Sequence, residues 1–282
     1  FDIYRNIGVT FDNGPVKIKE YLDRSYSILE NCIYGHKNAK IQILQIISKW
    51  ISNPQSNGNI IGLCGPPGNG KTTLVKKGIS KAINKPFSFI SLGGASDGHR
   101  FNGHDYTYEG AKCGRIVEIL KETKCMNPII FFDELDKISE TSRGEEISNL
   151  LCHITDFSQN DKFHDNFFSG IDFNISKSLF IFSFNDETKI NKILKDRIKV
   201  IKMEGFTEKD KINISNKYLF PDILREYNFK ENDISIPNNV TSYIIKQYTN
   251  EEKGVRNLKK CIDSIVSKLN ILRIIKYKID DP

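Results

Sequence analysis

The chain has 282 residues, of which 39% are hydrophobic and 27% are charged, the composition of an ordinary soluble globular protein. Its six cysteines show no C-x-x-C pair and no metal-ligand spacing, which argues against a disulfide scaffold or a zinc site and favours a reducing compartment. No apolar run approaches about 18 residues and no signal-peptide pattern opens the chain, so we expect a soluble cytoplasmic protein without a membrane partner. The net charge of +6 is spread along the chain, which disfavours nucleic acid as a partner.

The hydrophobic pattern divides the chain into three parts. Residues 1–20 carry weak signals and are interpreted as an N-terminal extension or linker. Residues 21–204 begin with a helical pattern that breaks at Tyr34-Gly35, and then alternate apolar strand-like runs with helical periodicity. Residues 205–282 contain helical patterns alone. The sequence therefore predicts an α/β domain followed by a small all-α lid domain.

The alternating region predicts a parallel sheet. Its strands are expected at residues 60–64, 86–92, 128–132, 179–184 and 199–203. The helices are expected at residues 115–123, 145–155, 190–194, 208–219, 221–226, 238–247 and 254–276. Strands that alternate with helices form parallel sheets covered on both faces, and ligands gather at the carboxyl ends of such strands. We therefore expect a binding site at that edge of a five-stranded parallel sheet.

The segment from Gly65 to Thr72 fits the phosphate-binding pattern G-x-x-x-x-G-K-[ST] at every fixed position. An apolar strand precedes it and a helical pattern follows it, which argues against a chance turn. The glycines let backbone N–H groups face phosphates, Lys71 reaches the β and γ oxygens, and Thr72 can hold Mg²⁺. The segment predicts that the chain binds a nucleoside triphosphate.

Polar residues also follow two other predicted strands. Of the pair Asp133-Glu134, one carboxylate can hold Mg²⁺ through water while the other polarises the attacking water. An isolated Asp-Glu is as often a plain strand end, but its place about 60 residues after the phosphate loop favours catalysis. We expect Asp136 and Lys137 to tune or brace the site. Asn185 ends the strand expected beside the phosphate-loop strand, where its amide could orient water or touch the γ-phosphate, although such an Asn is often a turn residue.

Arg197 and Arg256 are the two candidates for stabilising charge in the transition state. Phosphoryl transfer spreads negative charge over the γ-oxygens, and a guanidinium placed there is worth roughly 10³–10⁵ in rate. The alternative for either arginine is a surface salt bridge.

Several motifs together resemble the ATPase module of Lon-type proteases, within the AAA+ superfamily. Besides the phosphate loop they are Tyr34-Gly35-His36, Leu92-Gly93-Gly94, Gly103 to Gly110, Asn127-Pro128, Asp133 to Lys137, Gln159-Asn160, Phe163-His164-Asp165, Asp196-Arg197, Tyr248-Thr249 with Glu251, and Gly254 to Leu258. The resemblance covers about residues 21–269, and the combination is far more specific than the phosphate loop alone.

The resemblance implies ATP and Mg²⁺ as cofactors. The residues implied to bind the nucleotide are Tyr34, Gly35, Gly65, Pro66, Pro67, Gly68, Asn69, Gly70, Lys71, Thr72 and Thr73. Tyr34 and Gly35 would line the adenine pocket largely through their backbone, and Thr72 and Asp133 would serve the metal.

The resemblance also implies roles for residues outside the phosphate loop. Asn185 would be the first sensor and Arg256 the second, while Arg197 would be an arginine finger that acts on the ATP of a neighbouring subunit in a ring, a hexamer. One extra residue separates Asn185 from Arg197 relative to the family's spacing. Tyr108 matches the aromatic residue of a pore loop that grips a polypeptide substrate, but Glu109 replaces the apolar residue that follows it in the family.

Lon proteases carry a Ser–Lys dyad in a domain after the lid, and no Ser in this sequence lies in a nucleophile context such as G-x-S-x-G. We therefore expect an ATPase motor without peptidase activity of its own, like the shortened Lon-type ATPases of large DNA viruses. The alternative is a fragment of a full Lon serine protease, with a separate or downstream protease domain as its partner. Two further rivals are a nucleic-acid-directed motor or loader and an interaction protein that uses ATP only to assemble.

Overall fold

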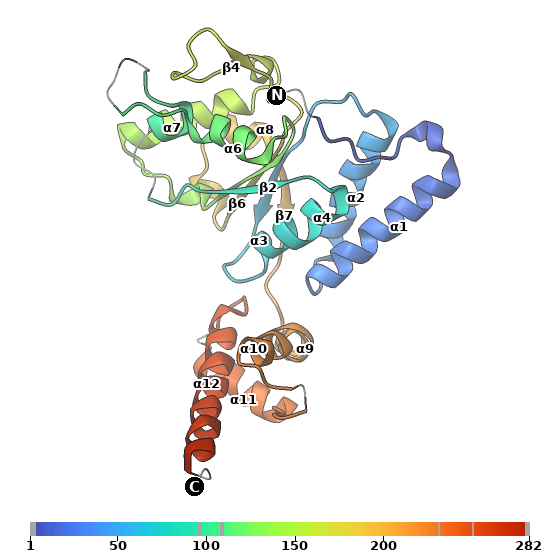
Figure 1. Ribbon diagram of the computed structural model, residues 1–282, viewed down its shortest axis with the longest axis vertical. Coiled ribbons are helices and arrows are strands. Elements are labelled where there is room, and N and C mark those ends of the chain that lie inside the picture. Colours follow the sequence, from blue (N-terminus) through green and yellow to red (C-terminus); the bar gives the residue numbers. More distant parts are fainter. Residues whose placement is uncertain are drawn as a thin grey trace. The chain divides into compact units, whose positions relative to one another are not determined.

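The computed structural model describes residues 4–94, 98–105, 107, 110–230, 232–249 and 251–279. Its contacts divide the chain into two compact units. The sheet unit consists of Phe1–Gly65 with Lys71–Met203, and the helical unit consists of Pro66–Gly70 with Glu204–Pro282. Figure 1 shows the strands of the first unit and the helices of the second.

A five-stranded parallel sheet forms the centre of the sheet unit, with strand order β2-β3-β6-β1-β7. The strands are β1 (Ile60–Cys64), β2 (Phe87–Ser91), β3 (Ile129–Asp133), β6 (Leu179–Phe184) and β7 (Lys199–Lys202). All six residues of β6 are buried, as expected for a central strand covered on both faces. The predicted five-stranded parallel sheet is confirmed, and the strand that ends before Asn185 pairs with β1 as expected.

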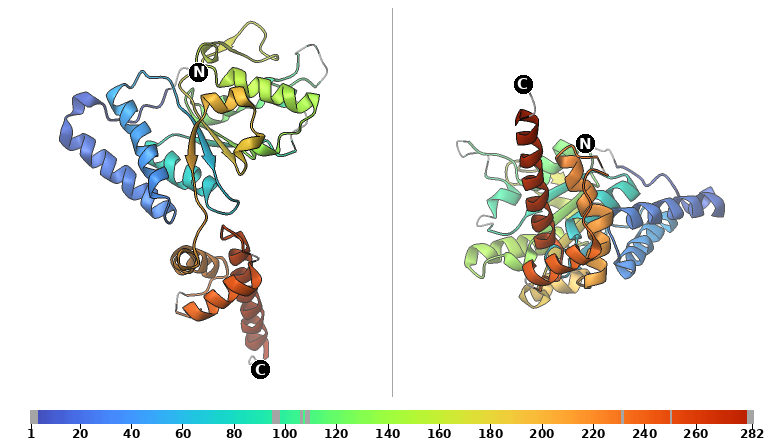
Figure 2. Two further views of the ribbon diagram at one scale, coloured as in Figure 1. Left: turned by 180° about the vertical axis from the view of Figure 1, so that it is seen from behind. Right: turned by 90° about the horizontal axis from the view of Figure 1, so that it is seen from below.

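Helices cover both faces of this sheet (Figures 1 and 2). On one face α1 (Pro15–Cys32), α2 (Lys37–Ser52) and the helix after β1 pack on Ile61, Leu63 and Phe131. On the other face α6 (Arg115–Thr123) and α7 (Ser142–Ile154) pack on Phe132 and Phe182, whose rings stack at 4.9 Å. Burying each such aromatic side chain stabilises the fold by about 1.5–3 kcal/mol, so the two apolar layers hold the strand ends in place.

The first helix begins earlier than the sequence indicated. We expected a linker through residue 20, but α1 starts at Pro15, directly after Gly14. Proline is favoured at the first helical position, because its missing N–H has no partner there and its φ is already helical. The apolar pattern of residues 15–20 was too weak to reveal this start.

The segment between α7 and β6, predicted to be irregular, contains a short antiparallel pair of strands, β4 (Phe163–His164) and β5 (Asp172–Phe173). In its described part, the excursion after β2 contains the short helix α5 (His99–Asn102). A further short helix, α8 (Lys192–Arg197), precedes β7.

The helical unit differs from the prediction at Pro221. Instead of two helices that break before this proline, α9 (Glu208–Ile214) continues through the wide turn Ser215–Leu219 into α10 (Phe220–Glu226). Phe220 N–H donates to the carbonyl of Ser215, five residues back. This widened turn makes room for the proline ring, which would clash in a regular α-helix.

The rest of the helical unit consists of α11 (Asn238–Tyr248) and α12 (Arg256–Ile279). Its own apolar core gathers side chains from α10, α11 and α12, including Ile223, Ile244, Leu258 and Val266. Among the described residues, no helix combines the length and the apolar character needed to cross a membrane.

Candidate nucleotide site

The phosphate loop lies between β1 and a helix that begins at Lys71. This helix consists of α3 (Lys71–Thr73), a wide turn (Leu74–Ile79) and α4 (Ser80–Ile83). Gly68 and Gly70 have φ angles of +74° and +93°, a backbone region that side chains other than glycine rarely adopt. The strand, the glycine turn and the helix start together form the frame in which backbone N–H groups bind phosphate.

Lys71 joins the ends of β1 and β6. Its side chain is buried, with 9% exposed, and its Nζ donates to the carbonyl of Gly65 at 2.6 Å and to Oδ1 of Asn185 at 3.0 Å. The ammonium group is therefore held at the carboxyl ends of two neighbouring strands. A positive charge fixed at this place suits the oxygens of a triphosphate.

Asp133 ends β3 and accepts a hydrogen bond at Oδ1 from the hydroxyl of Ser183 in β6. Ser183 is buried with 1% exposed. The sequence analysis missed Ser183, although a polar residue within an otherwise apolar strand was an available signal. This bond orients the Asp133 carboxylate at the same edge of the sheet as Lys71.

Glu134 has a φ of +63° and an exposed side chain. Its carboxylate lies over Gly93, where an added Cβ would come within 2.0 Å of Glu134 Oε2. The absence of a side chain at residue 93 therefore makes the space that this carboxylate fills. Gly93 belonged to a motif that supported the family resemblance, but the sequence assigned it no role.

Asp136 braces the turn that carries Asn185. It is 7% exposed, and its Oδ2 accepts hydrogen bonds from the backbone N–H groups of Asn185 and Asp186, both at 3.2 Å. A buried carboxylate that accepts two backbone hydrogen bonds restrains the loop it holds. These bonds are what a bracing role for Asp136 requires, and its part in the site stays a prediction.

The residues at this edge fit a magnesium nucleotide. The left-handed glycines leave a backbone cradle, and Lys71 supplies a buried ammonium group. The hydroxyl of Thr72 and the carboxylate of Asp133 are oxygen donors of the kind that Mg²⁺ prefers, and this ion commonly takes its remaining ligands from phosphates and water. Among the described residues, no cluster of three or more His, Cys, Asp or Glu side chains forms a metal cage.

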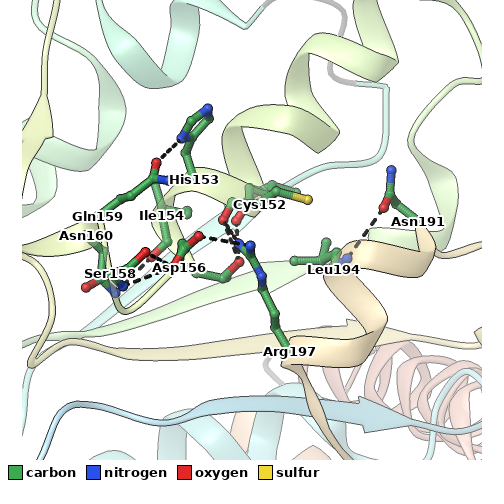
Figure 3. A network of polar contacts seen from close by, with 12 residues as sticks. Cys152, His153, Ile154, Asp156, Ser158, Gln159, Asn160, Asn191, Leu194 and Arg197 are labelled. Carbon is green, nitrogen blue, oxygen red and sulfur yellow. Dashed lines mark hydrogen bonds and ion pairs between the residues drawn. The ribbon is translucent and has the colours of Figure 1, made fainter.

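Arg197 ends α8 and is bound within its own protomer (Figure 3). Its Nη1 donates to the carbonyl of Cys152, and its Nη2 lies 3.0 Å from Oδ2 of Asp156. Both of these contacts hold the guanidinium against α7 and the turn that follows it. The hydroxyl and the backbone N–H of Ser158 donate hydrogen bonds to Asp156 Oδ1. These two bonds lower the pKa of Asp156, and the charge of Arg197 lowers it further.

Arg256 begins α12 in the helical unit, which also contains the loop segment Pro66–Gly70. Within this unit Val255 N–H donates to the carbonyl of Gly68 at 3.1 Å. Glu252 caps the helix, because its carboxylate accepts from the N–H of Arg256 at 3.0 Å and from that of Asn257 at 2.7 Å. The guanidinium of Arg256 is exposed.

Tyr34 and Gly35 lie in the turn between α1 and α2. The fully buried Lys40 fixes the start of this turn, since its Nζ donates to the carbonyl of Ile33 at 2.7 Å and to Oε2 of Glu30 at 2.9 Å. The sequence analysis did not predict a buried lysine at this position. The part of these two residues in binding adenine stays a prediction.

Tyr108 and Glu109, the expected pore-loop residues, lie outside the described residues. The base of their loop is fixed by two neighbouring side chains. Asp165 accepts from Gly114 N–H at 2.8 Å, and the side chain of Asn166 donates to the carbonyl of Gly103 at 3.1 Å. Burial raises the pKa of Asp165, an effect opposed by the backbone hydrogen bonds that it accepts.

Comparison with known proteins identifies two matching families. Residues 61–204 match the ATPase family associated with various cellular activities (AAA), and residues 225–278 match the Lon protease AAA+ ATPase lid domain. A Lon protease homolog of Acanthamoeba polyphaga mimivirus is 40% identical over 273 residues, which are 96% of this chain and 26% of that protein. The Lon protease of Clostridioides difficile is 37% identical over 270 residues, which are 96% of this chain and 33% of that protein.

The Lon protease of Lawsonia intracellularis is 38% identical and is matched over 30% of its length. The chain thus spans between a quarter and a third of these curated relatives. The matched regions agree with the sheet unit and the helical unit, and with the motifs that carried the resemblance. The chain belongs to the AAA ATPase family and is an AAA+ module of the Lon type.

Proposed function

We propose that the chain hydrolyses ATP in a Mg²⁺-dependent reaction and uses the energy to move a polypeptide. The observation that carries the proposal is the position of Lys71, which is buried at the start of the phosphate-loop helix and bonded to Asn185 on the neighbouring strand. Membership of the AAA family and the oxygen donors of Thr72 and Asp133 support the same assignment.

Each residue has a separate part in the proposed reaction. Lys71 and the loop N–H groups hold the phosphate oxygens, and Asn185 fixes the Lys71 ammonium group. Glu134, in the space above Gly93, orients the attacking water and accepts its proton. Asp133 and Thr72 would hold Mg²⁺, which when bound neutralises charge that develops on the phosphates.

We further propose that the active site is shared between subunits of a ring, a hexamer. The support is membership of the Lon-type AAA+ family, in which Arg197 matches an arginine finger, and the Cys152 carbonyl and Asp156 carboxylate hold its guanidinium in one orientation. A site completed by the neighbouring copy demands head-to-tail packing, and such packing closes into a ring when the rotation permits. Arg256 would report the state of the nucleotide to the lid domain, residues 205–282, and Tyr108 would contact the polypeptide in the pore.

The first experiment measures nucleotide binding and hydrolysis separately. Lys71→Ala should abolish binding of a fluorescent ATP analogue, whereas Glu134→Gln should bind it but lose at least about 10²-fold in kcat, the range expected for loss of a general base. Glu140→Gln, at an exposed position, is the matched control and should turn over normally. Normal turnover by Glu134→Gln would exclude Glu134 as the base.

A second set of assays distinguishes the polypeptide motor from its rivals. ATP turnover that rises with unfolded polypeptide and not with DNA would support the proposal, and the reverse would support a nucleic-acid motor or loader. Tyr108→Ala with unchanged partner activity would favour an interaction protein that uses ATP only to assemble. The relatives are named Lon proteases, but we propose no peptidase activity for these residues, and the cytoplasmic location stays a prediction.

A further inference from the structure

The sheet unit contains a cavity of about 350 Å³ at the edge opposite the nucleotide site. Its wall includes residues of the loops that lead into the strands: Ser56 before β1, Lys85 before β2, Asn127 before β3 and Lys177 before β6. In a parallel sheet these positions lie at the amino ends of the strands, whereas Lys71, Asp133 and Asn185 lie at the carboxyl ends.

The N-terminal segment closes one side of this cavity. The side chain of Asn127 accepts from the backbone N–H of Arg5 at 2.8 Å and donates to the carbonyl of Arg5 at 3.1 Å. Asn127 is 4% exposed, so this pair of bonds fixes the segment against the base of β3. The side chain of Arg5 remains exposed at the cavity.

The charges around the cavity all have one sign. Arg5, Lys85 and Lys177 line it, and no carboxylate lines it in the part of the chain that the structure describes. Lys85 is only 8% exposed, and its Nζ lies 5.1 Å from the centre of the Trp50 ring. Burial lowers the pKa of Lys85 from 10.5 to about 8, which means that burial disfavours its charged form.

The cavity wall also contains a buried hydroxyl group. The hydroxyl of Ser56 is buried without a hydrogen-bond partner among the described residues. The Ser56 hydroxyl, the ammonium group of Lys85 and the guanidinium of Arg5 can each donate a hydrogen bond to an acceptor in the cavity. Ile7, Val9 and Trp50 supply an apolar wall beside these donors.

We propose that this cavity binds a small organic oxyanion, a carboxylate or phosphate group carried on an apolar body. Lys177 donates to Oε1 of Gln55 at 2.7 Å, whereas the ammonium group of Lys85 and the hydroxyl of Ser56 are buried without an acceptor among the residues that the structure describes. Buried polar groups in proteins are normally paired, so these two donors indicate a ligand that supplies an acceptor. The volume lies within the range of small-molecule sites, which combine an apolar lining with a few polar groups. Because the cavity and the nucleotide site lie at opposite ends of the strands, the anion and ATP do not compete.

Trp50 makes the site directly observable, because it is the single tryptophan of the chain. The test titrates the intact chain with phenyl phosphate, with benzoate and with the neutral benzyl alcohol, and follows tryptophan fluorescence. We expect a saturable change with at least one of the two anions, with or without saturating ATP, and none with benzyl alcohol. The two anions then distinguish a phosphate from a carboxylate headgroup.

Substitution of the buried cation provides the second arm. Lys85→Met keeps the aliphatic stem and should weaken binding of the anion about tenfold or more, as expected for loss of a charge-assisted hydrogen bond. Lys81→Met, which removes a charge at an exposed position, should change the dissociation constant less than about twofold. If Lys85→Met fails to fold, Arg5→Gln replaces it, because that side chain is exposed.

In the titration, the proposal is overturned if neither anion gives a saturable signal, if benzyl alcohol gives the same signal, or if ATP displaces the anion. Among the variants, it is overturned if Lys85→Met and Arg5→Gln bind the anion as tightly as the unchanged chain. None of these outcomes bears on ATP hydrolysis, so the oxyanion site and the proposed function fail or succeed separately.

Discussion

The guanidinium of Arg197 and the carboxylate of Asp156 form an ion pair at 3.0 Å within one protomer. With the contact to the carbonyl of Cys152, this pair uses two of the five N–H donors of the guanidinium. In the proposed shared site, the remaining donors would bind phosphate oxygens of the neighbouring subunit's nucleotide. The ion pair therefore orients the guanidinium of Arg197 while leaving three of its N–H donors unused by these two contacts.

Asp156→Asn tests this positioning role. The substitution removes the charge partner of Arg197, and we expect kcat for ATP to fall about tenfold with little change in KM, since a finger acts in the transition state. Asp161→Asn, which changes an exposed carboxylate on the neighbouring turn, is the matched control. A rise in kcat for Asp156→Asn would contradict the account, because the carboxylate would then be sequestering Arg197.

Asn185→Ala removes the side-chain acceptor of the Lys71 ammonium group. A hydrogen bond to a charged group is worth about 1.5–3 kcal/mol, so kcat should fall by roughly 10- to 150-fold if the bond matters mainly in the transition state. Affinity for ATP should change only a few-fold. Steady-state kinetics beside the exposed control Asn57→Ala would decide, and an unchanged kcat would separate Asn185 from catalysis.

Gly93→Ala places a methyl group where the carboxylate of Glu134 lies. The colliding atom is the end of a flexible side chain, so we expect little loss of thermal stability but a displaced carboxylate, with kcat reduced at least about tenfold and nucleotide binding retained. Gly98→Ala is the control, since its Cβ would meet ordinary contacts with Glu146 at 3.7 Å and beyond. Full activity of Gly93→Ala would show that the position of Glu134 over Gly93 is not needed.

Lys85 makes stability depend on pH in a defined direction. Burial lowers its pKa from 10.5 to about 8, so between these values the unfolded chain binds more protons and stability contributed by this residue rises with pH. At pH 7 the buried charge costs on the order of 3 kcal/mol, and Lys85→Met should raise the free energy of unfolding by up to about that amount. Urea denaturation at pH 7 and pH 9.5 should show the gain shrinking at the higher pH. A gain that is absent, or that grows with pH, would contradict this assignment.

The sheet and the phosphate loop were predictable because their signals are local. Short apolar runs bounded by turns indicated each strand, and the alternation with helices indicated parallel pairing. We missed the start of α1 at Pro15, because a proline is favoured at the first helical position. We also missed the continuous helix through Pro221, because a widened turn accommodates a proline that would break a regular helix.

The supports of the candidate site were harder to foresee. The contact between Gly93 and Glu134 and the bond from Ser183 to Asp133 each join residues far apart in sequence. Side-chain periodicity gives the face on which a residue lies but not its partner across the sheet. The pairing of Arg197 with Asp156 was open for the same reason, because the sequence offered either a finger or a surface salt bridge.

The central claim, an ATP site completed by a second subunit, is tested most directly by mixing two inactive variants. Glu134→Gln keeps Arg197 and Arg197→Ala keeps Glu134, so an equal mixture that assembles at random restores both groups in about one site in four. The account predicts that ATPase activity returns in this mixture and does not return when the Glu134→Gln/Arg197→Ala double variant is mixed with Glu134→Gln. Failure to recover activity at any mixing ratio, or full-speed hydrolysis by a chain that stays monomeric with ATP and Mg²⁺, would contradict it.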